Sequence, residues 1–81
     1  MKARVYVSLK KTVLDPQGQT ICSALAGRGY AGITGVRQGK VFEIALAPDH
    51  DRSRAESELE EIARQILANP VIEDYRVEWV D

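Results

Sequence analysis

Three glycines near the middle of the chain have a spacing that could bind a cofactor. Gly27, Gly29 and Gly32 match the GxGxxG pattern, which cradles the pyrophosphate of a dinucleotide. In a dinucleotide site this pattern follows a strand and opens a helix, because the N-terminus of the helix faces the phosphates. Here the glycines follow a predicted helix and precede a predicted strand. We therefore interpret them as a loop that ends the helix, where glycine easily adopts the left-handed conformation.

Few other residues have types that suit chemistry. The segment Asp49-His50-Asp51 could bind a metal, but His50 is the only histidine and the pattern offers no further ligand to complete a site. Cys22 lies on the apolar side of a predicted helix, which favours packing over a nucleophilic role. The glutamates of residues 56–61 are spread around a second predicted helix, with no apolar pocket to shift a pKa. The sequence therefore predicts no catalytic or metal site and favours a small interaction domain.

The size and charge of the chain exclude several classes of protein. Its 81 residues are 44% hydrophobic and 28% charged, which predicts a single folded domain over residues 1–81. The formal net charge is −1 and there is no basic block, so we expect no nucleic-acid partner. No apolar run is long enough to cross a bilayer and no signal peptide is apparent, so we expect no membrane contact and a cytoplasmic location. The single cysteine, which cannot form an internal disulfide, fits a reducing compartment.

The first half of the chain predicts a strand, a helix and a second stretch of strand. Residues 2–10 alternate between apolar and polar side chains, as in a half-buried strand. Asp15-Pro16 is a helix start, so the helix should span about residues 16–28. After the glycines, residues 33–37 could form a short strand, and residues 40–47 predict a stronger one. Two arrangements stay open: a hairpin that turns at Gln38-Gly39, or one long strand bulged at Gly39.

The second half predicts a helix and a last strand. Ser53 followed by Glu56 forms a capping-box pattern, so the helix should begin at about residue 54. Its apolar residues recur at steps of three and four along the chain. In Asn69-Pro70, the asparagine suits the left-handed position that closes a helix, and the proline forbids continuation. Residues 72–80 then alternate as a strand.

These elements predict an α+β fold in the order β-α-β-β-α-β, in which the middle strands are possibly one long bulged strand. Both helices have a single apolar side, so we expect them on one face of an antiparallel sheet, as a two-layer sandwich. The other face should be a mixed surface that suits a second copy of the chain. The residues predicted for this dimer face are Tyr6, Val41, Glu43 and Ala45.

Three segments of the sequence resemble a known family. They are KARVYVSLKKTVLDPQG at residues 2–18, RGYAGITGVRQGKVFEI at residues 28–44 and LANPVIEDYRVE at residues 67–78. Together they resemble PurS, the small subunit of phosphoribosylformylglycinamidine synthase, over essentially the whole chain. The chain departs from the family at Thr12, where glycine is common, and at Arg28-Gly29-Tyr30, where a leucine-containing segment is common.

The resemblance implies that this chain is one subunit of an enzyme and that this subunit has no active site of its own. In the family, a synthetase subunit uses ATP and Mg to activate the ribonucleotide, and a glutaminase subunit releases ammonia from glutamine. The small subunit forms a homodimer or higher oligomer, joins the other two and supports ammonia transfer in purine (IMP) biosynthesis. It is expected to have no catalytic residue and to bind no cofactor. The residues expected to shape the partner surfaces are Lys11, Leu14, Asp15, Tyr30, Asn69, Pro70 and Tyr75.

The order of the elements leaves other functions open. A regulatory domain of similar topology would bind a small molecule at a dimer interface, and this is the main alternative. An RNA-recognition module would need exposed aromatic residues on its middle strand, where Phe42 is the only one. A phosphate-ester hydrolase would need an anion cradle, and the sequence shows no pattern for one.

Overall fold

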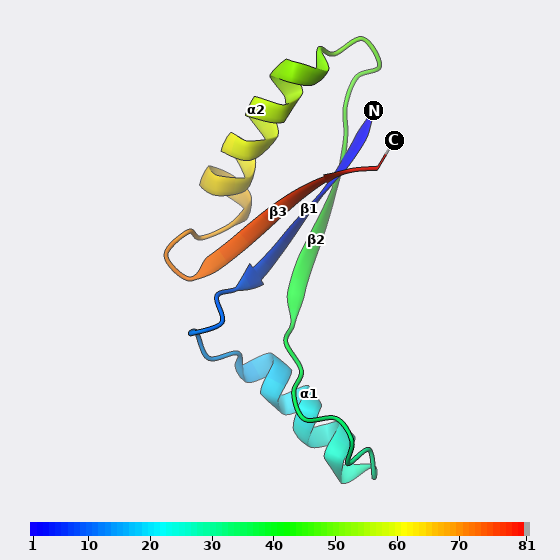
Figure 1. Cartoon of the computed structure of the whole chain (residues 1–81), viewed down its shortest axis with the longest axis vertical. Helices are drawn as coiled ribbons and strands as arrows, with labels where there is room; N and C mark the ends of the chain where they lie inside the picture. Colours follow the sequence, from blue (N-terminus) through cyan, green and yellow to red (C-terminus); the bar gives the residue numbers. More distant parts are fainter. Residues whose placement is uncertain (81) are drawn as a thin grey trace.

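A three-stranded antiparallel sheet forms the centre of the computed structural model, which describes residues 1–80 (Figure 1). The strands are β1 (Lys2–Leu9), β2 (Gly39–Ala45) and β3 (Glu73–Trp79), in the spatial order β2-β1-β3. β1 therefore lies in the middle and pairs with both neighbours over most of its length. The predicted α+β fold with an antiparallel sheet is confirmed.

One face of the sheet forms the core together with the second helix. Val5 lies opposite Phe42 on β2 and Val77 on β3, so these three side chains share that face. α2 (Arg52–Ile62) continues into η1 (Ala63–Leu67), a π-helical turn, and both pack on it. The most deeply buried residues of the two layers are Ala3, Val5, Val7, Ala55, Leu59 and Ala63. The alanines on α2 and η1 let the helix backbone approach the strands closely.

The ends of α2 differ from the prediction. The helix begins at Arg52, because Asp51 caps it: the Asp51 carboxylate accepts the Ser53 N–H at 3.1 Å. At the other end, Asn69 does not adopt the predicted left-handed conformation. Its side-chain oxygen instead accepts the Val71 N–H at 3.1 Å. This bond starts a turn after the helix in place of a left-handed cap.

Removal of the Asp51 cap should weaken α2 measurably. We expect Asp51→Ala to lower the free energy of unfolding by about 1 kcal/mol, because the first N–H groups of the helix lose an acceptor. Asp49→Ala is the matched control, since Asp49 lies in the preceding turn and makes no hydrogen bond to α2. Urea titration followed by circular dichroism measures both variants. Equal midpoints for the two would contradict the assignment of the cap.

The first helix does not lie on the sheet. α1 (Pro16–Gly27) extends away from the end of β1, and residues 28–38 return beside it to β2 (Figure 1). We call residues 14–38 the arm and residues 28–38 its return segment. The prediction of two helices on one face of the sheet is wrong for α1, because the turn after β1 does not reverse the chain. The arm gives the molecule its elongated shape, with extents of 51 × 27 × 14 Å.

The predicted strand at residues 33–37 does not form within the described residues, so the element order is β-α-β-α-β. These residues run beside α1, where no strand lies next to them to accept or donate ladder hydrogen bonds. Gly39 is neither the turn of a hairpin nor a bulge, because β2 begins there and pairs regularly with β1. Its lack of a side chain matters, since a Cβ at Gly39 would lie 2.8 Å from the carbonyl oxygen of Val7.

The glycine-rich segment ends α1, as predicted. Gly29 has a φ of 94°, in the left-handed region. The Tyr30 N–H that follows donates to the carbonyl of Leu25 at 3.0 Å and so satisfies one of the last free carbonyls of the helix. Within residues 1–80, no helix combines the length and the apolar character that crossing a membrane requires.

Candidate partner-binding surfaces

The Asp15 side chain holds the start of α1 and the return segment together at the base of the arm. Its side chain is only 4% exposed. One carboxylate oxygen accepts the Gln38 N–H at 2.7 Å, and the other accepts the Gly18 N–H at 3.0 Å, which caps α1. The hydrogen bonds from Gln38 and then Gly18, together with the charge of Arg37, lower the pKa of Asp15 below its ordinary value of 3.8. The cap was predicted from the sequence, but the bond from Gln38 was not.

Two further contacts fix the base of the arm. Arg37 donates to the carbonyl of Lys10 at 2.9 Å and to that of Leu9 at 3.4 Å. Gly18 passes so close to the return segment that a Cβ there would lie 2.2 Å from the carbonyl oxygen of Val36. We call the following residues the arm clasp: Asp15, Gly18, Arg37 and Gln38. The clasp joins the start of α1, the end of β1 and the return segment.

Acidification should loosen the arm clasp through Asp15. The pKa of Asp15 is lower in the folded chain than in the unfolded chain, so its charge stabilises the fold above about pH 4, and this stabilisation is lost as the pH falls through the folded pKa. We expect Asp15→Asn to melt roughly 5 °C below the wild type at about pH 7, because an amide offers one acceptor oxygen in place of two. This gap in melting temperature should narrow as the pH falls from about 7 to below about 4, because protonation of Asp15 removes the charge. Thermal melts across this range measure it, and a gap that does not change with pH would contradict the role of the charge.

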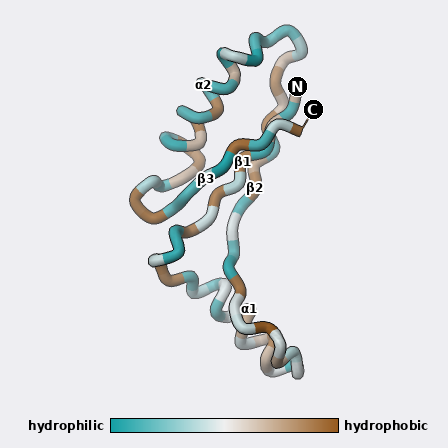
Figure 2. Tube along the Cα trace, in the orientation of Figure 1, coloured by the Kyte–Doolittle hydropathy of each residue, from teal (hydrophilic) through white to brown (hydrophobic). Residues whose placement is uncertain are grey.

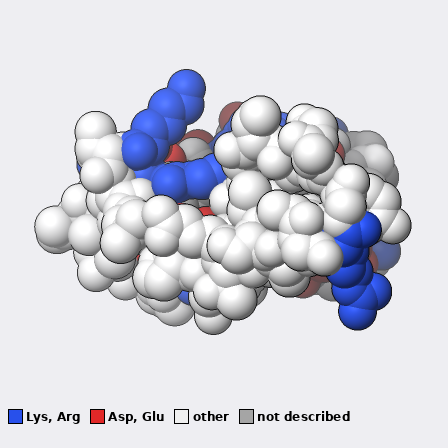
Figure 3. Space-filling model, turned by 90° about the horizontal axis from the view of Figure 1, so that it is seen from below, with Lys and Arg blue, Asp and Glu red and all other residues white. Residues whose placement is uncertain are grey.

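Several large apolar side chains of the arm are exposed. Leu14 and Tyr30 are 64% and 57% exposed, and Ile21 and Ile33 are exposed as well. α1 packs mainly against its own return segment, where the Cys22 thiol lies 3.9 Å from the carbonyl oxygen of Ile33. Viewed from the arm end, most of the molecular surface is neither basic nor acidic (Figure 3). An exposed apolar surface of this kind on a small protein indicates a contact with another chain.

A second exposed apolar group lies in the turn between η1 and β3, which Figure 2 shows as hydrophobic. Val71 is 79% exposed, and Ile72 beside it is also exposed. The Asn69 N–H donates to the Glu73 carboxylate at 2.7 Å, and the Glu73 N–H donates back to the Asn69 carbonyl at 2.7 Å. Pro70 stiffens the same turn. The turn therefore presents its apolar side chains in a fixed arrangement, which lowers the entropic cost of binding a partner.

The structure brings two of the predicted partner segments together. The Lys10 N–H donates to the carbonyl of Ile72 at 2.8 Å, so the turn after β1 lies beside the turn before β3 (Figure 1). Lys11 and Leu14, which are exposed, therefore share one end of the sheet with Pro70. Neither Val71 nor Ile72 was predicted for a partner surface, because Ile72 was assigned to the last strand, whereas β3 begins only at Glu73.

The two tyrosines predicted for the partner surfaces lie apart from this end. Tyr30 follows the C-terminal end of α1, at the tip of the arm. Tyr75 is half-buried on the face of β3 that meets α2, and its hydroxyl donates to the Glu60 carboxylate at 2.9 Å. This hydrogen bond raises the pKa of Tyr75 above its ordinary value. Tyr75 and Asp15 thus make contacts within the chain, and the role of the predicted residues in partner contacts stays a prediction.

The residues predicted for the dimer face do share one side of the sheet, the side opposite α2. Tyr6 lies opposite Val41, and the same register brings Glu43 and Ala45 to this side of β2. Val41 is 56% exposed. These residues form one continuous surface across β1 and β2, and its role as a dimer face stays a prediction.

The charged side chains of this face make contacts with one another and with Tyr6. The Glu43 carboxylate lies 3.2 Å from the Lys2 ammonium and 3.6 Å from the Arg4 guanidinium. Lys2 and then Arg4 lower the pKa of Glu43 below its ordinary value. The Arg76 guanidinium lies 4.2 Å from the centre of the Tyr6 ring. Contacts within the chain therefore occupy much of this surface.

The only histidine also has a partner within the chain. The Nε2 atom of His50 lies 2.6 Å from the Glu58 carboxylate. Residues 1–80 contain no cluster of three or more His, Cys, Asp or Glu side chains with a geometry that could hold a metal ion.

The sequence comparison places the chain in a family. Residues 2–81 match the family described as PurS, phosphoribosylformylglycinamidine (FGAM) synthase. The chain belongs to the PurS family. Phosphoribosylformylglycinamidine synthase subunit PurS of Mycobacterium leprae is 47% identical over 76 residues, which cover 94% of this chain and 91% of that protein. The PurS subunit of Bacillus subtilis is 44% identical over 77 residues, which cover 95% of this chain and 89% of that protein.

Solved PurS structures share the fold of this chain. The B. subtilis PurS structure has a TM-score of 0.81 at 44% identity, and the match covers 95% of this chain and 94% of that one. Methanocaldococcus jannaschii PurS has a TM-score of 0.81 at 38% identity, with 99% and 98% covered. A chain in the structure of PurLQS from Thermotoga maritima has a TM-score of 0.84 at 26% identity, with 98% and 95% covered. Because these matches span nearly the whole chain, the arm belongs to the PurS fold as much as the sheet does.

Proposed function

We propose that this chain is the non-catalytic small subunit of phosphoribosylformylglycinamidine synthase in de novo purine (IMP) biosynthesis. It joins an ATP-dependent synthetase subunit to a glutaminase subunit and supports the transfer of ammonia between them. The family supports this proposal, since M. jannaschii PurS is described as one of the subunits of formylglycinamide ribonucleotide amidotransferase in the purine biosynthetic pathway. The fold of this chain also occurs in the T. maritima PurLQS structure.

The observation that carries an assembly role is the exposed apolar surface of the arm. A chain of 81 residues has few large apolar residues to spare, yet it leaves Ile21, Tyr30 and Ile33 in contact with water. Burial of these side chains against another chain would stabilise both. We propose that a second copy covers part of the arm in a homodimer. The predicted dimer face around Tyr6 and Val41 is the second candidate for that contact.

The proposal assigns the chemistry to the partner subunits. The synthetase uses ATP and Mg to activate the amide oxygen of the ribonucleotide, and the glutaminase produces ammonia from glutamine. The small subunit binds no cofactor and works in the cytoplasm with its partners. Its contribution is to hold the two active subunits in an arrangement that protects ammonia from loss to solvent.

A mixing experiment tests the assembly role. The synthetase and glutaminase of the same organism are combined with and without this chain, and the molar masses are measured by gel filtration with light scattering. The proposal predicts a species that contains all three proteins only when this chain is present. Elution of the chain as a separate species, under conditions where the other two proteins are folded and active, would contradict it.

A further inference from the structure

The outer edge of β3 carries backbone groups that no residue of the described chain uses. Ile72 accepts the Lys10 N–H at 2.8 Å, and Val80 donates to the carbonyl of Lys2 at 3.0 Å. In an antiparallel pair the residues that bond to the neighbouring strand alternate, so the N–H and C=O groups of Tyr75 and Val77 point away from β1. Natural edge strands are often protected by charged side chains, above all lysine, by proline or by a bulge. β3 has no lysine, proline or bulge, and its charged residues Asp74, Arg76 and Glu78 lie on the side of the sheet opposite α2. The edge is therefore open to a further strand.

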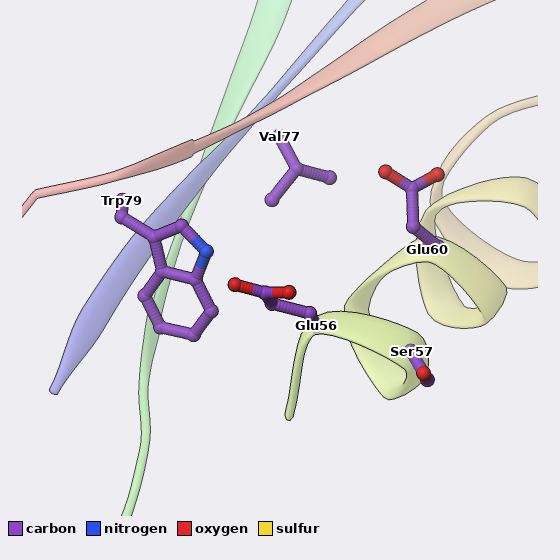
Figure 4. Close-up of a pocket in the computed structure, with 5 residues that line it drawn as sticks. All are labelled: Glu56, Ser57, Glu60, Val77 and Trp79. Carbon is purple, nitrogen blue, oxygen red and sulfur yellow. The ribbon is translucent and has the colours of Figure 1, made fainter. Parts of the chain in front are cut away.

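A groove of about 310 Å³ runs beneath this edge, between β3 and α2 (Figure 4). Val77 and Trp79 form its β3 side, because alternate residues of the strand face α2. Glu56 and Glu60, one helical turn apart, form its α2 side. A strand added to the edge of β3 would direct every second side chain into this space.

The groove is suited to a positively charged side chain. Glu56 has no hydrogen-bond or ion-pair partner in the described part of the chain, and the one hydrogen bond that Glu60 accepts there comes from the neutral Tyr75 hydroxyl. Trp79 already packs against a guanidinium, since the Arg52 side chain lies 4.4 Å from the centre of its ring. Glu56 and Glu60 thus face the groove without an ion pair to a cation of the described chain, while the Arg52 guanidinium already packs on the Trp79 ring beside them.

We propose that the β3 edge and this groove bind an extended segment of a partner protein that places an arginine or a lysine between Glu56 and Glu60. The backbone of the segment adds a fourth strand to the sheet, and the basic side chain supplies the specificity. The inference rests on the proposed function, because the partner is another protein of the synthase complex.

The return segment of a second copy is not suited to supply this strand. Of its two basic residues, Arg28 forms the C-cap of α1, and Arg37 is held in the arm clasp by the carbonyls of Leu9 and Lys10. The β3 groove and the arm therefore serve different partners, and their contributions can be separated by substitution.

Charge reversal in the groove tests the inference. We expect Glu56→Lys/Glu60→Lys to weaken binding to the synthetase and glutaminase at least about tenfold, with the homodimer and the circular dichroism spectrum unchanged. Glu61→Lys is the matched control, since Glu61 is exposed on α2 outside the groove and should bind as the wild type does. Binding of the double variant within about twofold of the wild type, while the wild type forms the complex, would overturn this inference and leave the proposed function intact. Failure of the wild type to form the complex would overturn both.

Hydrogen exchange gives a second readout that does not depend on a variant. The amides of Tyr75 and Val77 should exchange quickly in the free chain and become protected at least about tenfold in the complex, because they then donate to the added strand. The amides of Asp74 and Arg76, which face β1, should change little. Protection that does not increase at Tyr75 and Val77 in the assembled complex would overturn the added strand.

Discussion

Gly18→Ala should open the base of the arm and prevent assembly with the partner subunits. A Cβ at this position would lie 2.2 Å from the carbonyl oxygen of Val36 and 2.6 Å from a carboxylate oxygen of Asp15. The first atom belongs to the backbone, and the second is held by the Gln38 N–H, so neither gives way alone. The return segment must then move off α1, and we expect the free energy of unfolding to fall by about 3 kcal/mol.

Gly27→Ala is the matched control for this substitution. Gly27 lies in the same helix, and a Cβ there meets no atom within 4 Å, so the variant should be as stable as the wild type or slightly more stable. Urea unfolding and gel filtration with the two partner subunits compare the variants. If Gly18→Ala unfolds at the same midpoint as Gly27→Ala and still assembles, the arm clasp does not hold the arm in place.

Ile21→Asp should separate the homodimer while the monomer stays folded. Ile21 is exposed on the arm, so its loss removes little from the core, and we expect stability to change by about 0.5 kcal/mol or less. In a dimer that covers the arm, the same change would place a charge in an apolar contact. We expect at least about a 30-fold weaker dimer, the size of effect seen when one central apolar anchor is removed.

Gln19→Asp serves as its control, because Gln19 is an exposed polar residue of the same helix. Sedimentation equilibrium gives the dissociation constant of each variant. An unchanged dissociation constant for Ile21→Asp would show that the arm does not form the dimer interface. The sheet face around Tyr6 and Val41 would then be the candidate for that interface.

The ends of α1 could be predicted from the sequence because local chemistry determines them. Asp15 caps the helix, and Pro16 fits its first turn, because the N–H group that proline lacks would have no partner within the helix. Gly29 adopts the left-handed conformation that closes the helix. The strands were predicted for a similar reason, since alternation along the strand reflects one buried and one exposed face.

The position of α1 could not be predicted, because contacts between distant residues determine it. The Asp15 carboxylate reaches Gln38, 23 residues away, and Arg37 reaches the end of β1. No periodic pattern marks either contact. The Asp15 contact joins the return segment to the start of α1, and the Arg37 contact joins it to the end of β1. Residues 33–37 therefore run beside α1, with no neighbouring strand to pair with.

The residues predicted for the partner surfaces lie in different environments, and their role in partner contacts stays a prediction. Lys11, Leu14 and Pro70 are exposed at one end of the sheet, whereas Asp15 is buried in the clasp and Tyr75 is bonded to Glu60. A single sequence does not distinguish a residue that caps a helix from a residue that binds a partner, because both can be polar residues next to a turn. Burial in the folded chain separates the two.

The proposed function implies that this chain makes glutamine usable by the synthase without any chemistry of its own. The most direct test measures formation of the amidine product by the synthetase and glutaminase of the same organism, with and without this chain, using either glutamine or added ammonia as the nitrogen source. We predict that glutamine supports product formation only when the chain is present, whereas ammonia supports it in both cases. Full glutamine-dependent activity in the absence of the chain would contradict the claim.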